Sequence, residues 1–139
     1  MDAVVTTVTG LTTTGANVHR GRVHPVPESD LPALSVYMGQ DTPLDEDGQN
    51  VIGFMDSDLT VRIEAHVKAS TNIDQTLNQI RAEVHQALMA DYTLGLGFVH
   101  QVIWSGAGEP ELDAADQKIG RQALNWTVRY RHSVTDPTA

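Results

Sequence analysis

The stretch DLTVRIEAHVKA, residues 58–69, is followed almost at once by NIDQTLNQIRAEVHQALMA, residues 72–90, and these two segments decide the fold. In the first, apolar residues alternate with polar ones, which is the period of a strand with one buried side and one solvent-facing side. In the second, apolar residues recur every three or four positions, which predicts a helix with a single apolar stripe. We therefore expect a helix that packs on one face of a sheet.

Three further segments have strand-like patterns, namely residues 33–38, 98–104 and 121–132. With residues 58–69 they predict an α+β fold, a mainly antiparallel four-stranded sheet with the long helix packed on one face. Near the start of the chain, Val4, Val5 and Val8 have helical spacing. A short N-terminal helix is expected there, although the surrounding threonines lose side-chain freedom in helices.

The length of 139 residues fits a single domain covering residues 1–139. Two excursions that contain glycines and acidic residues interrupt the pattern, at 39–57 and 106–120. We interpret 39–57 as a long loop or hairpin arm, because a loop of this length in a small domain is uncommon without a function. Two uses of it remain open: contact with a partner, or pairing of residues 50–54 with the strand that begins at Asp58.

The composition excludes several function classes. Lysine and arginine total 9 against 18 acidic residues, a formal charge of −9, which argues against direct nucleic-acid binding through phosphate contacts. The chain has no cysteine, so disulfides, thiolate catalysis and cysteine-ligated zinc are excluded. No apolar run is long enough to cross a membrane, and the start of the chain does not resemble a secretion signal. We expect a soluble, non-secreted protein.

The sequence also lacks the patterns of a catalytic or metal site. The six histidines are scattered, without an HExxH motif or a pair spaced by four residues. The acidic run at 45–47 fails as a calcium loop, because its first and twelfth ligand positions would be Pro43 and Phe54. The glycine pairs at 95–97 and 106–108 lack the lysine of a phosphate-binding loop. We expect no enzyme activity, no cofactor and no metal.

Strand alternation places polar side chains, among them Arg62 and Glu64, on the sheet face away from the helix. Exposed arginines could pair with acidic groups of neighbouring chains, although an ordinary solvated role is the alternative for each. The candidate interface residues are Arg20, Arg22, Asp45, Asp47, Phe54, Arg62, Glu64, Arg129 and Arg131.

The order of local phrases resembles a known family. These phrases are TTGANVHRGRVHPV (13–26), ESDLPALSVYMGQD (28–41), IDQTLNQIRAEVHQAL (73–88) and LNWTVRYRHS (124–133). Together they look like the tail terminator proteins of long-tailed bacteriophages, the group that includes the minor tail protein U of lambda-like phages. The resemblance spans nearly the whole chain, but it rests on the order of elements and carries over no residue-level role.

The resemblance implies a structural virion protein. It would form a homohexameric ring that docks on the finished tail tube, stops further tube addition and forms the joint to the head. Its partners would be the tail tube protein and a head-completion or neck protein, at the head-proximal end of the tail and, during assembly, in the host cytoplasm. One alternative is another neck or head-completion connector. A second is a small ligand-binding α+β domain with a pocket holding His66, Glu64 and Arg129.

Overall fold

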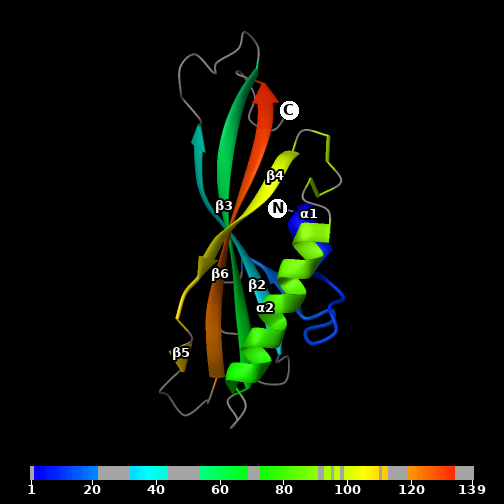
Figure 1. Cartoon of the computed structure of the whole chain (residues 1–139), viewed down its shortest axis with the longest axis vertical. Coiled ribbons are helices and arrows are strands. Elements are labelled where there is room, and N and C mark those ends of the chain that lie inside the picture. The colour runs from blue at the N-terminus through cyan, green and yellow to red at the C-terminus, as the bar shows by residue number, and fades with distance from the viewer. Residues whose placement is uncertain are drawn as a thin grey trace.

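The computed structural model describes residues 2–21, 32–43, 54–68, 73–90, 93–94, 96–97, 99–109, 111–112 and 119–133. Its elements in chain order are α1 (Asp2–Val8), β1 (Val18–Arg20), β2 (Ala33–Pro43), β3 (Phe54–Lys68), α2 (Ile73–Ala90), β4 (Val99–Ala107), β5 (Glu111–Leu112) and β6 (Ile119–Ser133). Both helices lie on the same side of a strongly twisted sheet, and the strands run along the longest axis (Figure 1).

In the described part of the chain the sheet has six strands, five of them in the order β1-β2-β3-β6-β4, with β5 pairing with β6. β1 runs parallel to β2, and every other pairing is antiparallel. The predicted fold class, a mainly antiparallel four-stranded sheet with one long helix and a short N-terminal helix, is therefore wrong. The sheet is mixed and larger.

The two unpredicted strands are too short to produce a recognisable period. β1 has three residues and β5 has two, whereas an alternating pattern needs about four residues to be visible. Their pairing is set by the neighbouring strands: Val18 lies opposite Leu34, and Glu111 lies opposite Arg121. The long strands also exceed their predicted bounds, since β3 and β6 each span 15 residues, about 50 Å of extended chain.

The core lies between α2 and the alternating face of the long strands. Val61 and Ile63 of β3 are fully buried, and so are Ile80 and Val84 of the apolar stripe of α2. All belong to one hydrophobic cluster, to which Trp126 of β6 adds the largest fully buried side chain. β3 and α2 thus build the centre of the molecule. We call the sheet face beneath α2 the helix face and the opposite one the polar face.

The N-terminal segment is tied to α2 rather than to the sheet centre. Val4 and Val8 of α1 are buried in the same cluster. In the turn that follows α1, the backbone N–H of Thr13 donates a hydrogen bond of 2.8 Å to Glu83 of α2, and the Thr13 hydroxyl contacts the same carboxylate. These bonds give the carboxylate of Glu83 two partners within the chain.

The two predicted excursions coincide partly with strands. Residues 39–43 and 54–57 lie in β2 and β3, and the two strands pair up to Pro43 opposite Ser57. Residues 44–53 of that excursion lie outside the described residues. Of the second excursion, residues 106–107 end β4, residues 111–112 form β5 and residues 119–120 begin β6. The upper parts of β2, β3 and β6 extend past both helices (Figure 1).

Among the described helices, none is long and apolar enough to cross a membrane. α2, the longer of them, has 18 residues and carries exposed polar side chains at positions such as Gln75, Gln79 and Gln86.

Truncation of the helix stripe should destabilise the fold strongly. Ile80→Ala removes a fully buried side chain between α2 and the sheet, and the expected loss of unfolding free energy is about 2–5 kcal/mol. Gln79→Ala, at the exposed adjacent position, is the matched control and should change stability by no more than about 0.5 kcal/mol. Urea unfolding followed by circular dichroism measures both. Equal effects for the two variants would contradict this placement of the core.

Candidate functional site

The polar face carries rows of cross-strand ion pairs where β3 and β6 extend past α2. Asp58 lies directly opposite Arg129, which donates hydrogen bonds of 2.9 Å from Nε and 3.2 Å from Nη2 to the two carboxylate oxygens. Two residues further, Asp56 lies opposite Arg131 and accepts a 3.1 Å bond from its Nε. Opposite charges at directly paired positions stabilise the register of the two strands.

Asp56 has a second partner from β4. His100 Nε2 lies 3.1 Å from the Asp56 oxygen that also accepts the bond from Arg131. Burial alone would raise the pKa of Asp56, but the hydrogen bonds and charges of Arg131 and His100 outweigh it, so that the pKa of Asp56 lies below its ordinary value of 3.8. Three strands are therefore joined at one carboxylate.

Arg62 and Glu64 lie on the same polar face, nearer the other end of β3. Arg62 Nη2 is 3.2 Å from Glu64 Oε2, and the Arg62 guanidinium lies over the ring of Tyr37 at 4.8 Å from its centroid. They line an open cavity of about 340 Å³. The other lining residues are Gly108, Glu109, Arg121 and Ala123. The cavity is lined by charges of both signs and shows no preference for a ligand of one charge.

The other predicted interface residues are spread over the chain. Arg20 is the last residue of β1 and is exposed, and Phe54 is the first residue of β3. Arg22, Asp45 and Asp47 lie outside the described residues. The six candidates that the structure describes therefore do not form one site.

The structure does not form the alternative small-ligand pocket, which would hold His66, Glu64 and Arg129 together. Glu64 lies opposite Ala123 of β6, whereas Arg129 lies opposite Asp58, six positions further along β3. Six strand residues span about 20 Å, so Glu64 and Arg129 cannot close on one small molecule. In the described part of the chain, no group of three or more His, Cys, Asp or Glu residues could hold a metal ion.

On the helix face, the extended part of β6 is anchored to β2 across β3. The Tyr130 hydroxyl donates a hydrogen bond to the Asp41 carboxylate. Burial and this contact raise the pKa of Tyr130 to about 12, so the phenol stays protonated at any physiological pH. The bond links strands that are not neighbours in the sheet.

The sheet has two open edges in the described residues. β1 covers the outer side of β2 only at residues 34–36, so residues 38–43 pair with β3 alone. β4 is the last strand of the order at the opposite edge. Three successive antiparallel pairings separate β2 from β4, so these two edges run in opposite directions.

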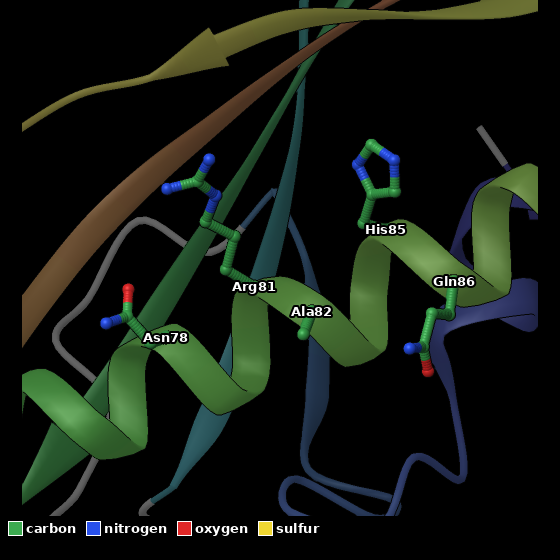
Figure 2. A pocket seen from close by; sticks show the side chains of 5 residues that line it. All are labelled: Asn78, Arg81, Ala82, His85 and Gln86. Atoms are coloured by element: carbon green, nitrogen blue, oxygen red, sulfur yellow. The ribbon is translucent and has the colours of Figure 1, made fainter.

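A second, open cavity, of about 370 Å³, lies along α2, and its lining residues all belong to that helix. In Figure 2, Arg81 and His85 extend from the helix toward β4 and β6, while Gln86 points away. The remaining lining residues are Asn78 and Ala82. Every polar lining residue offers N–H donors, and none of the lining residues is acidic.

Two of the lining residues of this donor-lined cavity, Arg81 and His85, contact tryptophan rings. The Arg81 guanidinium lies 5.5 Å from the ring centroid of Trp104, and the His85 ring lies 5.8 Å from Trp104 and 5.4 Å from Trp126. The two indole rings are 4.9 Å apart. From the sequence, His85 was counted among six scattered histidines and was not brought together with Arg81 and the tryptophans. The signal available was that Arg81 and His85 are spaced by four residues and so share one flank of the helix.

The polar-face ion pairs should be lost in acid. Because the folded-state pKa of Asp56 lies below 3.8, its pairing contributes stability above that pH and loses it as pH falls through the folded pKa. A double-mutant cycle of Asp56→Asn and Arg131→Gln should give a coupling free energy of about 0.2–1 kcal/mol at pH 7. Denaturant unfolding repeated below pH 3.8 should give a coupling that decreases as the pH falls. A coupling that did not change with pH would contradict the assignment.

No protein-family model matches the chain, and no curated protein sequence matches it. Solved structures do match in fold. One is a chain of a structure described as the virion of a native gene transfer agent (GTA) particle, with a TM-score of 0.56 and 20% sequence identity. The match covers 93% of this chain and 84% of that chain. At this identity the likeness concerns the fold.

Proposed function

We propose that this protein is a structural component of a phage-type virion and acts as the ring subunit that ends the tail tube. The proposal draws on two independent likenesses. The sequence phrases resemble the tail terminator family, and the fold is similar over nearly the whole chain to a chain of the GTA virion particle. The proposed activity is assembly by shape and contact, without catalysis.

The observation that carries the proposal is the pair of open strand edges. The edge at residues 38–43 of β2 and the edge of β4 run in opposite directions and lie at the same level of the sheet, because Met38, Val61, Trp126 and Trp104 form one register row. Copies placed side by side in one orientation can therefore pair β2 with β4 antiparallel. Repeated around an axis, such a head-to-tail contact closes into a ring.

The charged groups fit assembly better than catalysis. On the polar face, Arg129 and Arg131 are engaged by Asp58 and Asp56 in successive rows rather than converging on a cavity. Such rows keep two long strands in register and present a mixed surface to a neighbour. The six-fold ring, the tail tube and head-completion partners, and the head-proximal location follow from the family resemblance and belong to the proposal.

The proposal predicts a defined oligomer. Native mass spectrometry of the purified chain, alone or with assembled tail tubes, should give a species near six times the chain mass of 15.1 kDa. In the particle system that encodes the protein, its removal should give tail tubes of uncontrolled length in electron micrographs, because nothing would stop tube addition.

Two results would count against the proposal. A chain that stays monomeric both alone and with tail tubes is incompatible with a terminating ring. Tails of normal length that fail to join heads would instead place the ring on the head side of the neck and favour a head-completion connector.

A further inference from the structure

One row of the sheet ends in an exposed methionine at one edge and a half-buried tryptophan at the other. Met38 pairs with Val61, Val61 with Trp126, and Trp126 with Trp104. Directly paired residues in antiparallel strands point to the same face, and Val61 is buried beneath α2. Met38 and Trp104 therefore both point to the helix face, at opposite edges of one molecule.

Met38 is unusual on this surface. Among the residues whose side-chain exposure the structure describes, it is the only large apolar one that is exposed, with 59% of its surface accessible. It sits on the edge that no described strand covers, and the residues that follow it, 39–43, are exposed too. An apolar side chain on an uncovered edge strand favours contact with another chain.

The opposite end of the row offers a matching receptor. The Trp104 ring is contacted by two residues that line the donor-lined cavity along α2: Arg81 lies over it, and His85 makes a T-shaped contact with it. A methionine thioether makes favourable contacts with aromatic rings and adapts to irregular pockets. The charges also match: the β2 stretch 38–43 contains Asp41 and no basic residue, whereas the cavity lining contains Arg81 and no acidic residue.

We propose that residues 38–43 of β2 dock along β4 of a second copy of this chain, with Met38 inserted beside Trp104 of that copy. This inference rests on the proposed ring and specifies the contact that closes it. Because both residues belong to one register row, a neighbour in the same orientation and at the same level brings its Met38 to the Trp104 end. We call the Trp104 ring, with Arg81 and His85 in contact with it, the intersubunit socket.

Disulfide trapping tests the contact directly, because the chain has no native cysteine. In the double variant Met38→Cys with Trp104→Cys, the two thiols of one chain are three strand spacings apart, about 14 Å, which no disulfide can bridge. Oxidation should therefore give a ladder of covalent oligomers on a denaturing gel. Each single variant can form dimers at most and serves as the control.

Substitution of Met38 gives a test that leaves Trp104 in place. Met38→Asp puts a charge into the apolar contact and should weaken self-association at least about tenfold, as expected for an interface anchor. Met38→Leu keeps the apolar volume and should associate like the parent chain. Because Met38 is exposed, both variants should retain the circular dichroism spectrum of the parent and, at concentrations where all three chains are dissociated, its melting temperature.

Tryptophan fluorescence reports on the same socket. The chain has two tryptophans, and both belong to the cluster beside Arg81 and His85. The emission maximum of the parent chain should shift as dilution dissociates the oligomer, and for Met38→Asp the same shift should occur at concentrations at least about tenfold higher.

The outcomes separate this inference from the proposed function. If the parent chain forms the oligomer, but Met38→Asp assembles equally well and the double cysteine variant gives no ladder, the socket is wrong while the ring stands. If the parent chain never assembles, the ring itself is refuted. If the emission responds to another virion protein but not to self-association, the socket binds that protein, and the second-copy assignment is overturned.

Discussion

The structure depends above all on the antiparallel pairing of β3 with β6 over 15 residues beneath a helix that covers only part of their length. Burial of alternate residues, such as Ile63 and Leu124, fixes the register where α2 lies above the strands. A slip of one residue would turn these side chains toward the polar face. The strands are therefore already in register where the helix no longer covers them. This register sets the positions of the ion pairs on the polar face and of the two sheet edges.

Past the helix, other interactions hold the same register. The core thins out there, and the strands are joined by the ion pairs of Asp56 and Asp58 on the polar face and by the contact of Tyr130 with Asp41 on the helix face. Exposed ion pairs contribute little each, about 0–1 kcal/mol. Their placement at directly paired positions supports the native register, because a slip of one residue would move each aspartate away from the arginine opposite it.

The sequence predicted the elements whose periodicity is strong and missed those determined by tertiary contacts. Alternation over residues 58–69 and the stripe on α2 reflect burial by a neighbouring layer, which the residues themselves encode. β1 and β5 have no such signal, because their existence depends on the edges of β2 and β6.

The same limit applies to the candidate site. In the sequence, nothing distinguishes Asp56 and Asp58 from other acidic residues. Their pairing depends on the strand register, which places them opposite Arg131 and Arg129. Strand periodicity predicted that the arginines lie on the polar face, but it could not identify their partners within the chain. Met38 was read as one member of an alternating strand, because the sequence does not reveal which strand lies at an edge.

The two open edges of the sheet are irregular, and this irregularity limits which partner strands can pair with them. Register shifts interrupt β2 between Met38 and Asp41 and interrupt β4 on either side of the Val102 to Trp104 stretch. At Gly39 a Cβ atom would come within 3.1 Å of the Thr60 carbonyl oxygen, so a side chain there would crowd the backbone of β3. Irregular edges discourage indiscriminate strand addition, because a flat strand cannot satisfy both sides of a bulge. When a second copy of this chain binds in the same orientation, the irregular stretch of β2 meets the irregular stretch of β4 in the same way at every contact. The bulges that discourage random aggregation are therefore compatible with a repeated contact that closes a ring.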